Sequence, residues 1–305
     1  MTAPRPAAPA TPGATPVEAL ADDYLERSSL LDPCNAARMA IGGPSDELTD
    51  YSRQGEEARG ELDLATRRDL DAIDDGSTTA CMLREWLDAR VAAFTAGDDQ
   101  YLVRIIGGPV EGIRSAFDNM AKATTDDWEL IVSRLGKVPG AIGSARSGIE
   151  GARAGGRVEA RRQVLAVAAQ CDTFGGSDGG GGWFATLAEE CRRVVPTGPL
   201  LAAADRAAGA AAAAYRDLGA WLRTDYAPLA TDSDGVGPER YGRAACSTAP
   251  RPHPAGAASP HTGAAAARCR TPSPAAGRWW RRSAPAATPA RRRRPRWRST
   301  RRGRP

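Results

Sequence analysis

Apolar side chains recur at helical spacing along most of the chain, from residue 17 to about residue 243. One stripe lies within residues 54–74 and a second within residues 78–96; their members are Leu62, Ala65, Leu70 and Ile73, and Leu83, Leu87, Val91 and Phe94. Side chains three or four residues apart share one face of an α-helix, so each stripe predicts an amphipathic helix. No segment alternates convincingly as a half-buried strand does. The pattern therefore predicts an all-α, multi-helix array.

Local start and stop signals place further helices in the second half of this region. In "TTDDWE", Thr125 or Asp126 is expected to cap a helix while the Glu129 side chain reaches back to the cap. The apolar face of that helix is formed by Trp128, Ile131, Val132 and Leu135. Pro139 is expected to end or bend it, because proline lacks the backbone N–H that a helix interior uses. Further helices are predicted over 139–154, 158–172 and an alanine-rich 198–225.

Glycine-rich and acidic stretches separate these helices, and they show no catalytic pattern. Loops are predicted over 41–46, 106–109, 175–182 and 231–240. The run "GGSDGGGG" lacks the following GK[ST] of a phosphate-binding loop, so we interpret it as a flexible connection. Adjacent carboxylates can act as acid and base, but here they stand at helix starts or in loops and are interpreted as caps and solvated surface: Asp22/Asp23, Asp74/Asp75, Asp98/Asp99 and Asp126/Asp127. Arg161 and Arg162 are interpreted as an exposed helix face.

Charge divides the chain into unlike parts. Residues 244–305 hold fifteen Arg and no acidic residue, so the net charge of +4 leaves 4 − 15 = −11 for residues 1–243. An acidic region of this kind has no general attraction for phosphate backbones. Residues 1–16 form a Pro/Ala/Thr leader that is predicted to be disordered. The expected organisation is therefore a leader over 1–16, a helical region over 17–243 and a disordered tail over 244–305.

The tail has two interpretations. An Arg-rich arm could bind nucleic acid, with Trp279, Trp280 and Trp297 stacking on bases. However, the tail contains only Ala, Arg, Pro, Gly, Ser, Thr, Trp, Cys and His. Apart from His, each of these types has codons with G or C in the second position, as expected when a GC-rich gene is read in a shifted frame. We favour a frameshift near 241–245, and we expect any nucleic-acid binding by the tail to be non-specific.

The helical region lacks the residue types on which most catalytic and metal sites depend. Both histidines, His253 and His261, lie in the tail, and the six cysteines form no CxxC pair. The four cysteines of the helical region are interpreted as core thiols: Cys34, Cys81, Cys171 and Cys191. No signal peptide and no membrane-spanning apolar run is present, so a cytoplasmic protein without membrane contact is expected. No catalytic, cofactor-binding or metal-ligating residue is predicted.

Several segments, in order, resemble the bacterial DUF885 family. "YLERSSLLDPCNAARMAIGGPSDELTDYS" (24–52) resembles the opening of these proteins, and the likeness continues through "GPVEGIRSAFDNM" (108–120) and "DDWELIVSRLGKVPGAI" (126–142). It ends with "AYRDLGAWLRTDYAPLATDSDGVGPERY" (214–241) and so covers about residues 20–241. The individual motifs are loose, and their order carries the resemblance. It therefore stops where the composition of the tail begins.

The resemblance implies a helical zinc metallopeptidase whose His-Glu motif lies in the C-terminal half. Two His would hold the metal, a Glu would act as general base, and a further carboxylate would complete the site. No position matches that motif, since neither His253 nor His261 has the spacing or an adjacent Glu. We therefore expect a truncated DUF885-type protein without zinc or hydrolytic activity, whose helices would wall one side of a substrate cleft. The alternatives are nucleic-acid binding through the Arg/Trp arm and a helical interaction module. The substrate of intact relatives, a peptide or a small molecule, is not specified by this sequence.

Overall fold

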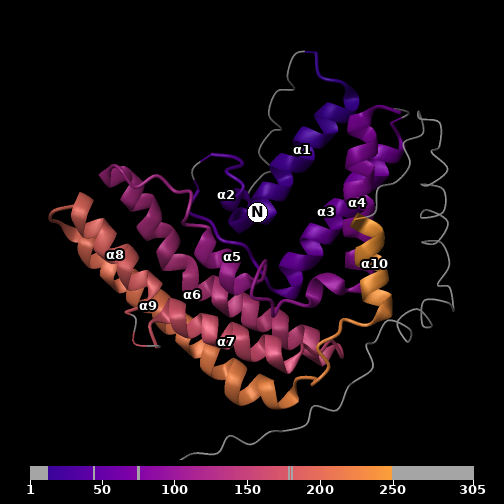
Figure 1. Ribbon diagram of the computed structural model, residues 1–305. Coiled ribbons are helices and arrows are strands. Elements are labelled where there is room, and N and C mark those ends of the chain that lie inside the picture. Colours follow the sequence, from indigo (N-terminus) through magenta and orange to yellow (C-terminus); the bar gives the residue numbers. More distant parts are fainter. Residues whose placement is uncertain (1–12, 44, 74–75, 178, 180, 249–305) are drawn as a thin grey trace, which may run out of the picture. The chain divides into compact units, whose positions relative to one another are not determined.

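A computed structural model describes residues 13–43, 45–73, 76–177, 179 and 181–248 (Figure 1). Helices and short turns make up the described chain, and an isolated bridge pairs Ala160 with Thr231. The predicted all-α fold is confirmed. In chain order the elements are α1 (Pro16–Leu31), α2 (Pro33–Arg38), α3 (Arg53–Asp71), α4 (Thr78–Ala96), η1 (Asp98–Gln100), α5 (Pro109–Ser115), α6 (Thr125–Ala154), α7 (Arg161–Gly175), α8 (Trp183–Val194), α9 (Pro199–Trp221), η2 (Leu222–Tyr226), η3 (Ala227–Leu229) and α10 (Pro238–Thr248).

The helices with clear apolar stripes begin and end close to their predicted bounds. The side chains of Thr15, Ser52 and Ser77 each accept a hydrogen bond from the backbone of the first turn, which fixes the starts of α1, α3 and α4. At the other end of α4, Gly97 adopts a left-handed conformation with φ 70°, which stops the helix. Leader residues 1–12 lie outside the described residues.

Pro139 was expected to end or bend the helix; it does not end it, because α6 continues through Pro139 to Ala154. Buried side chains on both sides of the proline, including Leu135, Val138 and Ile142, hold one continuous face against the core. Tertiary packing on that face outweighs the lost hydrogen bond. The predicted cap is also displaced: Thr124 caps α6, and the Asp127 side chain reaches back to it.

The segments predicted as individual helices did not include α1, α2, α5, α8 or α10. Helices α2 and α5 are too short for a periodic stripe, whereas α8 does carry one in Phe184, Leu187, Ala188 and Cys191. Helix α10 begins inside the predicted loop 231–240 and continues beyond residue 243, the predicted end of the helical region. Arg161 and Arg162 lie on an exposed helix face as predicted, with side chains 40% and 65% exposed, and they pair there with Asp232 at 2.8 Å and Asp234 at 3.0 Å.

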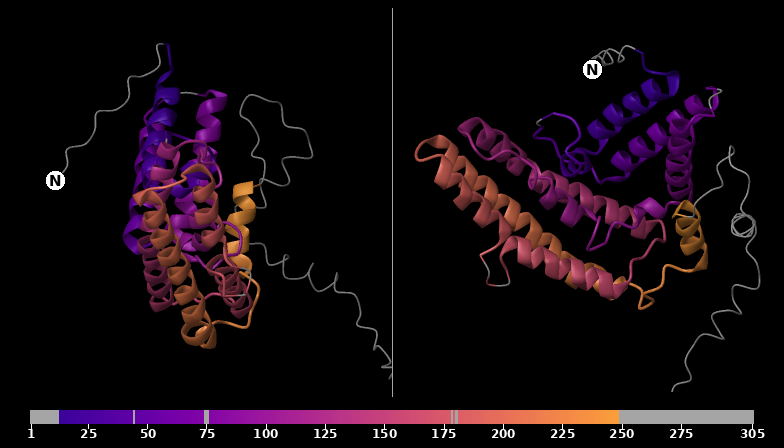
Figure 2. Two further views of the ribbon diagram at one scale, coloured as in Figure 1. Left: turned by 90° about the vertical axis from the view of Figure 1, so that its left-hand side faces the viewer. Right: turned by 45° about the horizontal axis from the view of Figure 1, so that its top comes forward.

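The larger of two apolar clusters is organised around α9, which packs against α6, α7 and α8 (Figures 1 and 2). Small side chains let α9 approach its neighbours closely; a Cβ atom at Gly219 would lie 3.0 Å from the Cβ atom of Cys171. Phe184 and Tyr215 fill the centre with ring centroids 5.0 Å apart, and the Tyr215 hydroxyl donates to the Val110 carbonyl at 2.8 Å. Three of the predicted core thiols are buried, Cys34, Cys171 and Cys191, while Cys81 is partly exposed.

The smaller cluster joins α1, α3 and α4, which pack against one another. Its buried members are Val17, Tyr24, Leu62, Leu70, Ala80 and Leu87. Charged side chains add to this contact, for example the ion pair between Arg67 of α3 and Asp88 of α4 at 2.6 Å. None of the helices in the described part of the chain is both long and apolar enough to cross a membrane.

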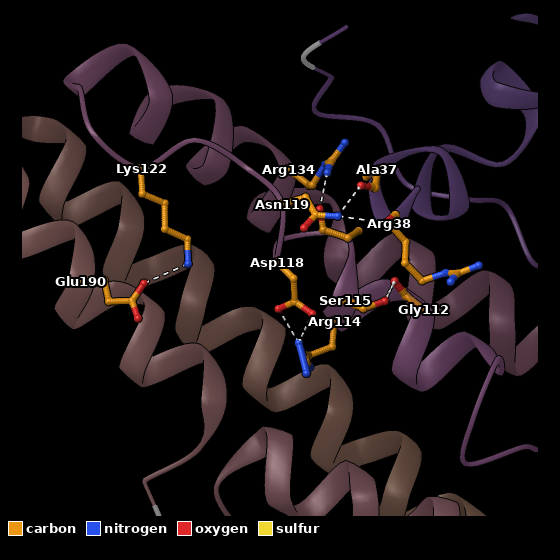
Figure 3. A network of polar contacts seen from close by, with 11 residues as sticks. Ala37, Arg38, Gly112, Arg114, Ser115, Asp118, Asn119, Lys122, Arg134 and Glu190 are labelled. Atoms are coloured by element: carbon orange, nitrogen blue, oxygen red, sulfur yellow. Dashed lines mark hydrogen bonds and ion pairs between the residues drawn. The ribbon is translucent and has the colours of Figure 1, made fainter. Parts of the chain in front are cut away.

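A polar network fixes α2 onto the turn between α5 and α6 (Figure 3). The Asn119 amide donates to the carbonyl oxygens of Ala37 at 3.2 Å and Arg38 at 2.9 Å. From α6, the buried Arg134 guanidinium donates to the Ala116 carbonyl at 2.6 Å. These bonds satisfy carbonyl groups at the ends of short helices, which have no partners within the helix. They hold the segment after α2 in place and so position the chain that leads to α3.

Candidate ligand-binding cavity

A charged cavity of about 220 Å³ lies where α3 and α4 meet η1 and the segment before α5. Its wall contains four acidic and three basic side chains, namely Asp32, Glu56, Asp63 and Asp99, and Arg59, Arg90 and Arg104. We refer to this space as the Glu56 cavity. A concave site with several titratable groups is a common place for ligand binding, and the charged groups of this wall differ in whether they have partners.

Glycine residues allow the walls of the Glu56 cavity to come together. A Cβ atom at Gly60 would lie 2.2 Å from the Phe94 ring, so α3 can approach α4 only with glycine at this position. After Gly97 ends α4, the two acids of η1 take separate roles. Asp98 pairs with Arg243 of α10 at 2.6 Å, while Asp99 lines the cavity.

Glu56 is the most unusual residue of the cavity. Only 8% of its surface is exposed, and its carboxylate accepts no hydrogen bond from the described residues. Burial, reinforced by the negative charge of Asp99, raises its pKa to about 7, although Arg59 and Arg104 oppose the shift. A carboxyl group of this kind can gain or lose a proton near neutral pH.

Asp99 is a second acid with incomplete hydrogen bonding. Its Oδ1 atom is buried and has no hydrogen-bond partner in the described part of the chain. Burial raises the pKa of this carboxyl group as well. The solvated surface predicted for Asp98/Asp99 is therefore wrong at both positions, because the Asp98 side chain is only 14% exposed and paired with Arg243, and Oδ1 of Asp99 is enclosed.

Arg104 and Arg59 supply the positive charge near Glu56. The Arg104 side chain remains solvent-exposed, and its guanidinium forms no hydrogen bond or ion pair with any described residue. Loss of hydration and the nearby Arg240 charge lower its pKa, despite the opposing charges of Glu159, Glu56 and Asp99. Arg59 is held in place, since its Nη1 atom donates to the carbonyl oxygens of Asp50 at 2.7 Å and Leu31 at 3.3 Å.

The remaining charges of the wall are already paired. Arg90 forms an ion pair with Asp63 at 2.9 Å, and the Tyr24 hydroxyl donates to the same carboxylate at 2.7 Å. Burial raises the pKa of Tyr24 to about 12, so its hydroxyl keeps its proton. The Asp32 carboxylate accepts from the Thr49 hydroxyl at 2.6 Å. The hydrogen-bonding groups of the wall that lack a described partner thus belong to Glu56, Asp99 and Arg104.

The other residues considered from the sequence do not assemble into a site. Asp127 caps α6, Asp23 pairs with Arg27 at 3.2 Å on the surface, and Asp74/Asp75 lie outside the described residues. His253 and His261 also lie outside them. Sequence reasoning missed Glu56 because it stands in the strongly charged run "RQGEEARGELD", where nothing marks one acid as buried.

The described residues do not fit a zinc ion. They contain no histidine, and no three His, Cys, Asp or Glu side chains among them lie close enough to hold a metal. The buried cysteines are poor ligands, since burial raises the pKa of Cys171 to about 12 and that of Cys34 above its usual value. We therefore derive no metal-dependent step from these residues.

The fold and cavity define an all-helical protein with a small charged cavity and no recognisable nucleophile–base pair among the residues of its wall. The family model of DUF885, bacterial proteins of unknown function, matches residues 33–250. The chain belongs to the DUF885 family. The match continues through the start of the predicted tail and includes every residue of α10. No curated protein matches the sequence.

Proposed function

We propose that this chain is a ligand-binding helical part of a DUF885-type, metallopeptidase-like protein, and that as given it binds without hydrolysing. The observation that carries the proposal is Glu56, a nearly buried carboxylate without a hydrogen-bond partner among the described residues, in a cavity with Asp99 and Arg104. Leaving such a group unsatisfied costs free energy, which a bound ligand could recover. The helices of the family match would then form one wall of a substrate cleft.

The absence of hydrolysis is a proposal that rests on the residues available. Zinc peptidase chemistry needs two His on one helix turn and an adjacent Glu, and neither His253 nor His261 has such a neighbour. The composition of 244–305 supports the proposal that this stretch is read in a shifted frame, so that the His-Glu motif is not encoded here. Translating the nucleotide sequence around codons 240–246 in all frames tests this; stop codons throughout the other frames would contradict it.

Metal analysis and peptide hydrolysis test the proposal on the purified full-length chain. We expect substoichiometric zinc and no hydrolysis of a mixed peptide library, with or without added zinc. Stoichiometric zinc that survives dialysis, together with zinc-dependent cleavage, would overturn it. A chain with both histidines replaced, His253→Ala and His261→Ala, shows whether any retained zinc depends on them.

Binding of nucleic acid through the Arg/Trp-rich tail is the second candidate function. Fifteen Arg residues in 244–305 predict attraction to any polyanion, with an affinity that falls steeply with salt. DNA affinity of the full chain should therefore exceed that of a chain ending at Ala249, equally for unrelated sequences. Preference for one DNA sequence at physiological salt would favour an evolved nucleic-acid function over our proposal.

A helical interaction module in the cytoplasm is the third candidate. The exposed Trp86, Met82 and Leu30 on α4 and α1 are consistent with a partner surface. Thermal melting of residues 17–243 tests it: a self-sufficient module should melt in one sharp transition, whereas a part that depends on a missing neighbour should melt broadly or aggregate.

A further inference from the structure

Opposite charges share the Glu56 cavity without bridging one another. The Arg104 charge lowers the pKa of Glu56, and the Glu56 and Asp99 charges act on the pKa of Arg104, but among the described residues no ion pair or hydrogen bond joins Arg104 to either acid. Glu56 is 92% buried, since 8% of its surface is exposed, and Oδ1 of Asp99 is fully enclosed without a partner among the described residues. Acidic and basic side chains thus line one cavity, with no described contact between Arg104 and either Glu56 or Asp99.

Several charged side chains of α3, α4 and η1 form direct ion pairs instead. Arg90 meets Asp63 at 2.9 Å on the same wall, Arg67 meets Asp88 at 2.6 Å, and Arg243 meets Asp98 at 2.6 Å. Because a buried carboxylate without a partner is unfavourable, Glu56 and Asp99 would gain from a donor in the cavity, whereas the exposed Arg104 guanidinium is solvated and open to a ligand anion. A molecule that carries both a cation and an anion would satisfy both signs at once.

We propose that the Glu56 cavity binds a small zwitterion, with its ammonium group at Glu56 and Asp99 and its carboxylate at Arg104. This inference rests on the proposed ligand-binding function and names the class of ligand. Ammonium supplies the donors that the two carboxylates lack, and a planar guanidinium pairs well with a carboxylate. Arg59, held by backbone carbonyls, adds positive charge near the same space.

The volume limits the ligand to a small molecule. The cavity measures about 220 Å³, below the roughly 300–1,000 Å³ typical of pockets for drug-sized ligands. An amino acid with a short spacer between its charged groups is of suitable size, whereas a folded partner or a long peptide would extend outside. The spacing between the two charged groups should therefore decide affinity.

Binding of the ammonium should release a proton near neutral pH. Glu56 has a pKa of about 7 in the empty cavity, and a cation beside it favours the ionised form. Affinity should consequently fall as pH drops below 7. The charges that act on the pKa of Glu56 are Asp99 and Asp50, which raise it, and Arg59 and Arg104, which lower it. The other charged or titratable groups that face the cavity are Asp32, Tyr51, Asp63 and Arg90.

Calorimetric titration of the full chain tests the proposal with a series of graded charge spacing. The zwitterions are glycine, β-alanine, 4-aminobutyrate and 5-aminopentanoate, and the single-charge controls are ethylamine and propionate. We expect one zwitterion to bind about tenfold or more tightly than either control at pH 8. The same titration in buffers of different ionisation enthalpy should reveal proton release on binding at pH 7.

Matched variants separate a local role from a structural one. Glu56→Gln should weaken the best zwitterion about tenfold or more and abolish proton release, while propionate is unaffected. Glu57→Gln makes the same change on the next residue, an exposed partner of Arg53, and should change nothing. Arg104→Gln should weaken zwitterion and propionate alike, with Arg53→Gln as its control. Circular dichroism of each variant checks that the fold is retained.

The outcomes separate the zwitterion proposal from the more general proposal that the cavity binds a ligand. One outcome is that ethylamine or propionate binds as tightly as every zwitterion, and that this binding is lost in Glu56→Gln or Arg104→Gln. The zwitterion proposal is then overturned, while the proposed ligand-binding function stands. If no compound of the series binds between pH 6 and pH 8 at concentrations near 10 mM, which corresponds to a free energy of only about 3 kcal/mol, both fail. Binding that survives Glu56→Gln with its proton release also overturns the proposal.

Discussion

The two apolar clusters of this protein differ in how they are held together. Around α9, the larger cluster buries rings such as Phe184 and Tyr215 and small side chains in close contact. Between α1, α3 and α4 the smaller cluster has six fully buried members, and much of the contact is made by charged side chains. The Glu56 cavity lies along the second region, whose helices α3 and α4 form much of its wall.

This difference indicates where function can be built. A closely packed apolar core leaves no room for unsatisfied polar groups, since any such group would be costly there. The contact between α3 and α4, which charged side chains help to hold together, accommodates the buried acid Glu56 and a cavity beside it. We infer that the packing of α6 to α9 contributes most of the stability. The contact between α3 and α4 is less stable, because these helices leave room for the Glu56 cavity. Three comparisons test this division.

The largest effect is expected when the charge-based contact of α3 with α4 is broken. Arg90→Gln removes the partner of Asp63, whose side chain is only 4% exposed, and should lower the free energy of unfolding by about 3 kcal/mol. Arg27→Gln breaks an exposed pair with Asp23 and should cost less than about 1 kcal/mol. Urea denaturation at pH 7 measures both. Equal, small losses would show that charge pairs do not hold the α3–α4 layer.

Glu56→Gln should stabilise the protein, by an amount that depends on pH. The folded state holds the proton of Glu56 up to pH 7, whereas the unfolded chain releases it near pH 4.5, so this group destabilises the fold increasingly as pH rises between these values. The amide cannot ionise and avoids this cost. We expect little change at pH 4 and a gain of at most about 3 kcal/mol at pH 8. A gain that is the same at both pH values would contradict this account.

The smallest effects should come from glycines of α6 that differ in their surroundings. A Cβ atom at Gly148 would lie 2.2 Å from the carbonyl oxygen of Tyr51, so Gly148→Ala should cost about 1–3 kcal/mol and displace a segment beside the cavity. Gly143 has nothing within 4 Å, and Gly143→Ala should gain up to about 1 kcal/mol. Thermal melting compares them. If both substitutions raise the melting temperature, the Tyr51 carbonyl does not lie as close to Gly148 of α6 as described.

Sequence alone predicted the elements whose stability is local or strongly periodic. The stripe of Leu83, Leu87, Val91 and Phe94 predicted a helix within 78–96, and α4 has these bounds because Ser77 caps its start and Gly97 stops it. The break at Pro139 was predicted wrongly, since the packing of Leu135 and Val138 against distant helices decides that point. Similarly, the cavity brings Glu56 together with Asp99 and Arg104, which lie more than forty positions further along the chain. A local sequence pattern therefore could not predict this group of charges.

The central claim is that Glu56 is a buried, ligand-ready acid, and the most direct test is its own titration. With glutamate ¹³C-labelled at Cδ, the Glu56 resonance, assigned through its loss in Glu56→Gln, can be followed by NMR from pH 4 to pH 9. We predict a midpoint near pH 7 in the free protein, moved to lower pH by a saturating zwitterion. A midpoint near the ordinary value of 4.5, unchanged by every ligand of the series, would contradict the account.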